Sequence, residues 1–186
     1  MIELRVPALE LLPQYKAAVE RNWSPYTTRS LTGSELDRLY NHPKDFLAEI
    51  SGEDISEPFA LPDGTKVPRL PGFARWVWDG DFCGSLNFRW QPGTSQLPPH
   101  VMGHIGYAVV PWKQNRGYAK EGLRLLLREI GKLGLAYVEI TTDPDNVASQ
   151  KVILANRGEL VERFTKSPHY DGTEGLRYRI DFANNG

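Results

Sequence analysis

One segment decides the fold of this chain: Val109-Val110-Pro111-Trp112-Lys113-Gln114-Asn115-Arg116-Gly117-Tyr118-Ala119. It starts within an apolar, strand-like run that begins at His104, and it continues through a polar turn. This turn leads into a segment in which small and apolar residues recur at the spacing of one helical face, at Ala119, Gly122, Leu123, Leu126, Leu127, Ile130 and Leu133. The spacing predicts an amphipathic helix over residues 117–132.

Gly117 stands at the predicted start of this helix, where backbone N–H groups have no intrahelical acceptor. Converging N–H groups and the positive end of the helix dipole favour an anion at such a place. The absence of a Cβ at Gly117 also lets a phosphate approach the backbone closely. The turn therefore predicts a phosphate-binding segment made of Gln114, Asn115, Arg116, Gly117, Tyr118 and Ala119.

The spacing Gln114-x-x-Gly117-x-Ala119 resembles the pyrophosphate-binding signature of the GNAT acyltransferase superfamily, Gln/Arg-x-x-Gly-x-Gly/Ala. It is neither a dinucleotide-binding Gly-x-Gly-x-x-Gly fingerprint nor a P-loop. The resemblance covers residues 73–182, is most specific over residues 104–158, and is closest to a subgroup of uncharacterised predicted acetyltransferases. It implies acetyl-CoA (coenzyme A) as the cofactor. Backbone donors of the turn and pantetheine contacts are expected to bind it strongly enough without a metal.

The remaining sequence predicts a single α/β domain over residues 1–186. A cap at Thr32 or Ser34 and a break at Pro43 are expected in the second N-terminal helix. Asp79-Gly80-Asp81 predicts a hairpin turn. The expected elements are helices 8–22 and 33–49, strands 73–78, 82–90 and 104–110, helix 117–132, strand 136–142, helix 146–156, and strands 159–165 and 175–182.

This element order is similar to the GNAT fold, which has an N-terminal helical pair, a β-hairpin front and a parallel splay flanked by helices. The resemblance implies a mixed sheet of that type. N-terminal helices and an acceptor-site loop occupy residues 1–72, and a cofactor-binding core occupies residues 73–182. Loops 50–72 and 91–103 are expected to shape the acceptor pocket, because long loops of compact domains often lie over a site.

A second motif, Asn146-x-x-Ser149, opens the helix after the strand that ends near Thr142. It resembles the second GNAT segment, in which the asparagine side chain contacts the pantetheine arm. Asp145 or Asn146 also suits an N-cap, and the two roles are compatible. The resemblance further implies cofactor contacts from the edge of the strand at Val109 and Val110, with the Val109 N–H directed at the thioester carbonyl.

The resemblance implies direct acetyl transfer to an amine, and this requires a proton acceptor. A lysine-like amine with a pKa of ~10.4 is only about 0.1% neutral near pH 7. His104 is the candidate base, and the alternative is a strand histidine bonded to a neighbour. Many family members have a tyrosine seven residues after the asparagine, and this tyrosine protonates the leaving thiolate. This chain has Ile153 at that position. Tyr107, Ser149, ordered water and Tyr170 remain as candidate proton donors to the leaving thiolate.

Composition narrows the possible partners. The chain has 22 Lys and Arg against 23 Asp and Glu, a formal net charge of −1, which does not suggest a general binder of nucleic acid or membrane surfaces. One cysteine, Cys83, excludes an internal disulfide and a cysteine-based zinc site. The N-terminus shows no signal-peptide pattern and no apolar run is long enough to span a membrane, so a cytoplasmic protein is expected.

The leading hypothesis is an acetyl-CoA-dependent N-acetyltransferase that acts on a small-molecule or peptide amine. A homodimer is expected only by analogy with the family. The alternative is a catalytically degenerate acyl-CoA-binding sensor or regulatory module, supported by Ile153 and by the uncertain base. A third hypothesis is an unrelated α/β protein that binds another phosphate ligand at residues 114–119.

Overall fold

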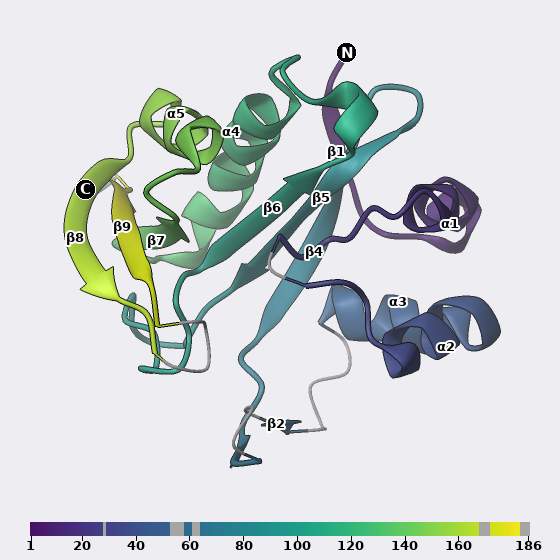
Figure 1. Ribbon diagram of the computed structural model, residues 1–186, viewed down its shortest axis with the longest axis horizontal. Coiled ribbons are helices and arrows are strands. Elements are labelled where there is room, and N and C mark those ends of the chain that lie inside the picture. The colour runs from purple at the N-terminus through teal and green to yellow at the C-terminus, as the bar shows by residue number, and fades with distance from the viewer. Residues whose placement is uncertain (28, 53–57, 61–63, 168–171, 183–186) are drawn as a thin grey trace. The chain divides into compact units, whose positions relative to one another are not determined.

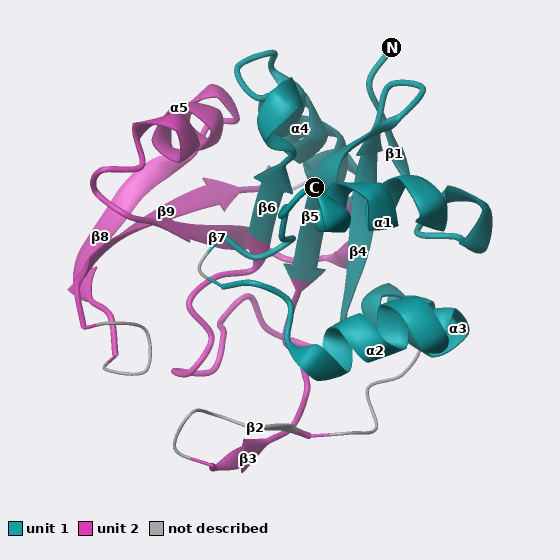
Figure 2. Ribbon diagram, turned by 45° about the vertical axis from the view of Figure 1, so that its right-hand side comes forward, with its two compact units in different colours: residues 1–54, 72–88, 106–129 teal, residues 55–71, 89–105, 130–186 magenta. Residues whose placement is uncertain are grey.

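A computed structural model of the protein describes residues 1–27, 29–52, 58–60, 64–167 and 172–182. It contains two compact units, which Figure 2 shows in different colours. Unit 1 comprises residues 1–54, 72–88 and 106–129, and unit 2 comprises residues 55–71, 89–105 and 130–186. Helices and strands occur in both (Figure 1), which confirms the mixed α/β class. The single domain over residues 1–186 remains a prediction.

Unit 1 is built on a four-stranded sheet with the strand order β1-β4-β5-β6. The predicted hairpin around Asp79-Gly80-Asp81 is confirmed, since β4 and β5 are neighbours in this order. The sequence did not predict β1, which pairs antiparallel with β4 and places Leu4 opposite Val77. The four strands are β1 (Glu3–Arg5), β4 (Gly72–Trp78), β5 (Phe82–Arg89) and β6 (Ile105–Val109).

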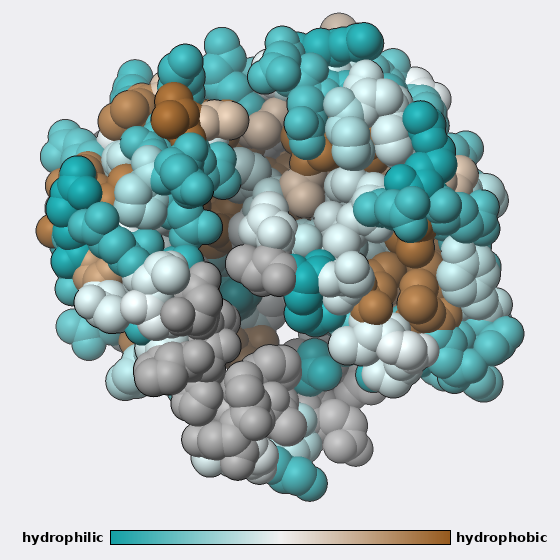
Figure 3. Space-filling model, viewed as in Figure 1, coloured by the Kyte–Doolittle hydropathy of each residue, from teal (hydrophilic) through white to brown (hydrophobic). Residues whose placement is uncertain are grey.

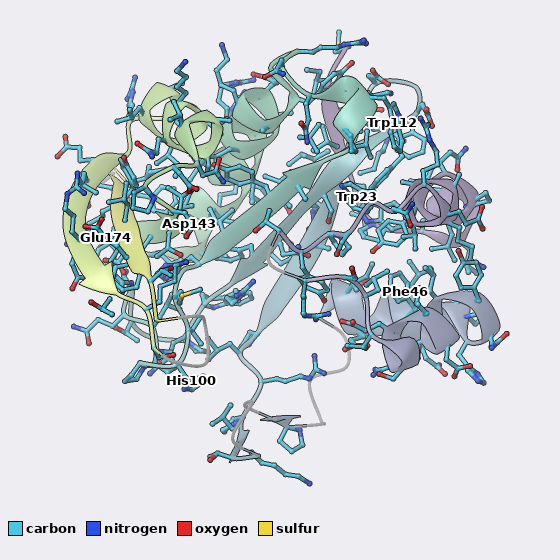
Figure 4. All side chains as sticks on the ribbon, in the orientation of Figure 1. Trp23, Phe46, His100, Trp112, Asp143 and Glu174 are labelled. Carbon is cyan, nitrogen blue, oxygen red and sulfur yellow. The ribbon has the colours of Figure 1, made fainter. Side chains whose placement is uncertain are left out.

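An aromatic core covers one face of this sheet. Trp76 of β4 is fully buried and stacks on Tyr15 of α1 (Leu12–Glu20) with ring centroids 4.9 Å apart. Phe82 of β5 meets Trp76 edge to face at 5.7 Å. The short helix η1 (Leu9–Leu11) precedes α1. Figure 3 shows hydrophobic residues gathered between α1 and α3, near the Phe46 label of Figure 4. Packing of the Tyr15 ring against Trp76 and Phe82 stabilises the contact between α1 and the sheet.

The opposite face of the sheet carries α4 (Tyr118–Ile130). Val77 points away from its neighbour Trp76 because successive strand residues alternate between faces. A Cβ added at Gly122 of α4 would lie 3.1 Å from the side chains of both Val77 and Leu86. Glycine therefore lets the helix pack closely against β4 and β5, which fixes the direction of its N-terminus.

The expected break at Pro43 is confirmed. The predicted helix 33–49 is two helices, α2 (Gly33–Asn41) and α3 (Pro43–Ser51), and Pro43 occupies the first turn of α3. Thr32 caps α2 in a capping box, with its hydroxyl accepting the Glu35 N–H and the Glu35 carboxylate accepting the Thr32 N–H. Among the described residues, no helix is long and apolar enough to cross a membrane.

Unit 2 contains a three-stranded antiparallel sheet in the order β7-β9-β8. Helix α5 (Val147–Ala155) and the short helix η3 (Gly131–Leu133) belong to the same unit. The parallel splay remains a prediction for β6 and β7, each of which is an edge strand of its own sheet. The strands are β7 (Tyr137–Thr142), β8 (Glu159–Thr165), β9 (Glu174–Asp181) and the short pair β2 (Phe59–Ala60) and β3 (Lys66–Val67).

Close contact between β5 and β6 makes a glycine necessary at position 84. A Cβ at Gly84 would lie 2.3 Å from the Ala108 carbonyl oxygen. We expect Gly84→Ala to lower the free energy of unfolding by about 3 kcal/mol, because backbone must move to relieve the overlap. Urea unfolding measures the change. Gly33→Ala is the control, since its Cβ would meet no atom within 4 Å. Equal stability of Gly84→Ala and the parent would contradict this contact.

Candidate functional site

The segment between β6 and α4 forms a turn with a left-handed backbone. The short helix η2 (Pro111–Lys113) follows the strand, and residues 114–117, here called the anion turn, lead into α4. Asn115 has a φ of 59° and Gly117 a φ of 82°. A Cβ at Gly117 would meet no heavy atom within 4 Å. Backbone conformation rather than crowding therefore favours glycine, and space is left above it for a ligand.

The start of α4 offers N–H groups to an anion. Its first backbone bond runs from the Glu121 N–H to the Gly117 carbonyl at 2.9 Å. Within the described part of the chain, no backbone carbonyl accepts the N–H of Gly117, Tyr118 or Ala119. The anion turn itself is exposed. These donors and the helix dipole fit a phosphate group, as the sequence predicts.

The end of β6 presents one backbone edge to a ligand. The Val110 N–H donates to the Cys83 carbonyl at 2.9 Å, so Val109, its neighbour, directs its own N–H away from β5. Because β6 is an edge strand, that N–H points to the open side of the sheet. The Gln114 side chain donates to the Val109 carbonyl at 3.3 Å and ties the anion turn to the strand end.

Val110 has a structural role in this geometry. Its side chain is fully buried, its N–H is bonded to Cys83 and its carbonyl accepts the Lys113 N–H at 2.9 Å. The cofactor contact that the resemblance implies for Val110 stays a prediction, and its carbonyl oxygen keeps a second lone pair that could accept a hydrogen bond.

The carboxylate of Asp79 is hydrogen-bonded to residues on both sides of the anion turn, and the sequence did not predict this. Asp79 accepts hydrogen bonds from Lys113 Nζ at 2.8 Å and from the Tyr118 hydroxyl. The hydrogen bond to Asp79 is the main cause of a raised pKa of Tyr118. Asp79 lies in a hairpin turn, a place where aspartate is common for local reasons, so the sequence offered no signal for this longer-range role.

Asn146 and Ser149 belong to unit 2. Asn146 Oδ1 accepts the Ser149 N–H at 3.0 Å, which resolves the choice between Asp145 and Asn146 as the N-cap of α5. Asn146 is exposed and Ser149 is half-buried. The cap uses the side-chain oxygen of Asn146 and leaves its amide nitrogen as a possible donor to a ligand.

The expected candidates for proton transfer lie in different surroundings. Ile153, at the position of the family tyrosine, is fully buried, and its Cγ2 atom would lie 2.3 Å from a Cβ at Gly158. A side chain at Gly158 would therefore overlap Ile153, so the glycine lets the chain pass close to this buried residue. Tyr107 on β6 is half-buried. Tyr170 lies outside the described residues.

His104 is fully buried in unit 2. The imidazole Nδ1 of His104 accepts the backbone N–H of Glu139 at 2.9 Å, and the backbone N–H of His104 donates to the Glu139 carbonyl at 2.7 Å. Burial lowers the pKa of His104 to about 4, and the Glu139 carboxylate opposes this shift only in part. An imidazole that no solvent reaches cannot contact an amine as it stands, so the geometry favours the alternative of a strand histidine bonded to a neighbour.

The chain matches one family of known proteins over its central part. The model of the acetyltransferase (GNAT) domain matches residues 53–158, more than half of the chain. The chain belongs to the GNAT acetyltransferase family. This membership confirms the predicted acetyltransferase class and acetyl-CoA as the donor. A comparison with curated proteins finds no significant match.

Solved structures share the GNAT fold with this chain at low sequence identity. The microcin C7 self-immunity acetyltransferase MccE, in complex with acetyl-CoA and AMP, has a TM-score of 0.66 at 15% identity over 97% of this chain and 92% of that one. An acetyltransferase from Salmonella typhimurium that modifies the N-terminal serine of a ribosomal protein gives 0.65 at 16% identity over 97% and 94%. A ribosomal-protein alanine acetyltransferase from Vibrio fischeri gives 0.66 at 14% identity over 98% and 94%.

Burial of His104 predicts a specific acid sensitivity. Its folded pKa of about 4 lies below the unfolded value of ~6.5, so the unfolded chain binds the proton first and stability is lost as pH falls from about 6.5 towards 4. We expect the loss of unfolding free energy between pH 7 and pH 4.5 to be about 2–3 kcal/mol smaller in His104→Gln than in the parent. Urea unfolding at both pH values measures it. Equal losses in the two proteins would contradict the buried, neutral histidine.

Proposed function

We propose that the protein transfers an acetyl group from acetyl-CoA directly to a primary amine of a small molecule or a peptide. The observation that carries this proposal is the exposed anion turn, followed by N–H groups without a backbone acceptor, in a GNAT family member. Acetyl-CoA supplies the acetyl group as an activated thioester when it is bound. The chain's own residues would bind the pyrophosphate near Gly117 and orient the thioester near Val109.

The anion turn has enough donors for useful affinity. A charge-assisted hydrogen bond contributes roughly 1.5–3 kcal/mol, and micromolar binding needs about 8 kcal/mol. The N–H groups of Gly117, Tyr118 and Ala119 supply a large part of this. Exposed cations on Arg116 and Lys120 add Coulomb attraction. Asn146 and Ser149, which belong to unit 2, stay predicted contacts of the pantetheine arm.

Val109 is the residue best placed to assist the chemistry. Its N–H points to the open side of β6 and would donate to the thioester oxygen as negative charge develops there. A preorganised donor of this kind contributes roughly 3–4 kcal/mol to catalysis. The Val109 carbonyl is held by Gln114, which fixes the orientation of the strand end.

The burial of His104 favours an acceptor amine of low pKa, because this histidine is not exposed to take the proton from the amine. Without this base, the acceptor must arrive neutral or lose its proton to water. At pH 7 that costs roughly 4–5 kcal/mol for a lysine side chain but only about 1 kcal/mol for a peptide α-amine with a pKa near ~7.8. We therefore favour an α-amine acceptor, the class named for the Salmonella typhimurium structure.

A second candidate function is a CoA-binding module without turnover. The buried Ile153 in place of a tyrosine and the buried His104 favour it. Such a module would bind acetyl-CoA at the anion turn yet transfer no acetyl group to any amine. Mass spectrometry of peptides with free or blocked N-termini, incubated with enzyme and acetyl-CoA, separates the two functions.

The donor site is tested by calorimetric titration with acetyl-CoA. We expect low-micromolar binding to the parent and no measurable binding to Gly117→Glu, because the new carboxylate occupies the phosphate position and repels it. Gly134→Glu is a matched control, since Gly134 is also exposed, left-handed at φ 75° and free of close neighbours. Equal binding by the parent and Gly117→Glu would contradict the proposed cofactor site.

The pH dependence of the reaction tests the α-amine proposal. With a peptide acceptor, log kcat/KM should rise with a slope near one up to about pH 8, the pKa of the α-amine. His104→Gln should leave this profile unchanged. An inflection near pH 6.5 that is present in the parent and lost in His104→Gln would show instead that the histidine acts as the base.

A further inference from the structure

The two carboxylate oxygens of Asp79 bind residues on either end of the anion turn. Oδ1 accepts the bond from Lys113 Nζ at 2.8 Å, and Oδ2 accepts the bond from the Tyr118 hydroxyl. Lys113 directly precedes residues 114–117, and Tyr118 directly follows them. One side chain from the β4–β5 hairpin therefore connects the entry and the exit of the turn.

The hydrogen bonds of Asp79 with Lys113 and Tyr118, here called the Asp79 bridge, are made by side chains that are partly or largely buried. Lys113 has further polar neighbours. The side chains of Lys113 and Asp79 are 13% and 23% exposed. Lys113 Nζ also lies 3.4 Å from Cys83 Sγ and 3.8 Å from the Asp81 carboxylate. Burial raises the pKa of Asp79, but the hydrogen bonds from Lys113 and Tyr118 outweigh it and hold that pKa below its usual range. Asp79 is thus ionised near neutral pH, and its negative charge balances the positive charge of Lys113.

A second contact holds the segment that precedes the anion turn. The guanidinium carbon of Arg21 lies 3.3 Å from the ring centroid of Trp112, which Figure 4 labels. Such cation–π contacts stabilise by roughly 0.5–2 kcal/mol. This contact fixes η2 alone, whereas Asp79 connects η2 with the start of α4.

We propose that Asp79 is a positioning residue for acetyl-CoA: it holds Lys113 and Tyr118 so that the N–H groups at the start of α4 converge on the pyrophosphate. The inference rests on the proposed function, because it concerns the same cofactor site. Asp79 acts through the turn and makes no contact with reacting atoms in this role. Donors fixed before binding avoid the cost of being ordered by the ligand.

Charge alone predicts the opposite effect of removing Asp79. A carboxylate repels a nearby phosphate, and loss of the bridge would release the ammonium of Lys113 to attract it. If Coulomb forces dominated, a variant without this carboxylate would bind acetyl-CoA more tightly. If Asp79 positions the anion turn, the variant binds acetyl-CoA more weakly. The direction of the change therefore distinguishes the two effects.

The experiment compares Asp79→Asn with Asp81→Asn. Asp81 lies in the same hairpin turn, but its carboxylate is 3.8 Å from Lys113 Nζ and its side chain is 60% exposed. For each protein, calorimetry gives the Kd of acetyl-CoA. Kinetics give kcat and KM with acetyl-CoA and with S-acetylpantetheine, which lacks the pyrophosphate.

We expect Asp79→Asn to raise the Kd and KM for acetyl-CoA about tenfold, equivalent to about 1.4 kcal/mol, with kcat unchanged. Its kcat/KM with S-acetylpantetheine should equal that of the parent, because a merely destabilised enzyme would lose both activities. Asp81→Asn should bind acetyl-CoA as the parent does or more tightly.

Unchanged or tighter acetyl-CoA binding by Asp79→Asn would overturn the positioning role and leave the proposed function intact. Equal losses with acetyl-CoA and S-acetylpantetheine would also overturn it, since the damage would not be confined to the pyrophosphate. A parent protein that does not bind acetyl-CoA would overturn the proposed function itself, and this inference with it.

Tyr118→Phe tests the same bridge without a change of charge. It removes only the hydroxyl that donates to Asp79. We expect weaker acetyl-CoA binding, and no further loss when Tyr118→Phe is combined with Asp79→Asn, because both act on one bridge. If Asp79→Asn does not fold, Tyr118→Phe decides alone, and an unchanged Kd overturns the proposal.

Discussion

The candidate site depends on the N–H groups at the start of α4, for which no backbone carbonyl among the described residues is an acceptor. A buried donor without an acceptor costs about 1–3 kcal/mol, so the chain can keep such groups only where solvent or a ligand reaches them. The exposed anion turn meets this condition, and its left-handed residues Asn115 and Gly117 turn the backbone into the helix. Gly122 then sets α4 closely against β4 and β5, so the positive end of the helix dipole has a fixed direction.

The cationic side chains near the anion turn have different roles, since one is held in an ion pair within the protein and another is exposed to a ligand. Lys113 is committed to Asp79, while Arg116 is exposed and has room to meet a phosphate. The near-neutral chain, with a formal net charge of −1, therefore needs no large basic surface to bind an anionic cofactor. Local geometry, rather than net charge, would provide the affinity.

Most elements of the fold were predictable from the sequence because their patterns are strong and local. The helix after Gly117, the hairpin at Asp79-Gly80-Asp81 and the break at Pro43 each follow from periodicity or from one residue's backbone preference. The strand Glu3–Arg5 was missed, as was the pair β2 and β3, because two or three residues show no alternation.

The left-handed turn before α4 was also predictable, whereas the surroundings of the remaining candidate residues were not. The buried His104 is hydrogen-bonded to Glu139, 35 positions further along the chain, and no spacing rule links the two. Asp79 is separated by 34 and 39 positions from Lys113 and Tyr118. Such contacts arise from tertiary packing, which pattern and propensity do not encode.

Amide chemical shifts test most directly whether the start of α4 holds the pyrophosphate. In the isotope-labelled protein, titration with CoA should move the amide proton resonances of Gly117, Tyr118 and Ala119 downfield, because each donor gains a charged acceptor. The same resonances should respond to 3′,5′-ADP, which carries phosphates without pantetheine, and should stay in place with pantetheine alone. Binding of CoA that leaves these three resonances unmoved would contradict the assignment of the anion turn as the cofactor site.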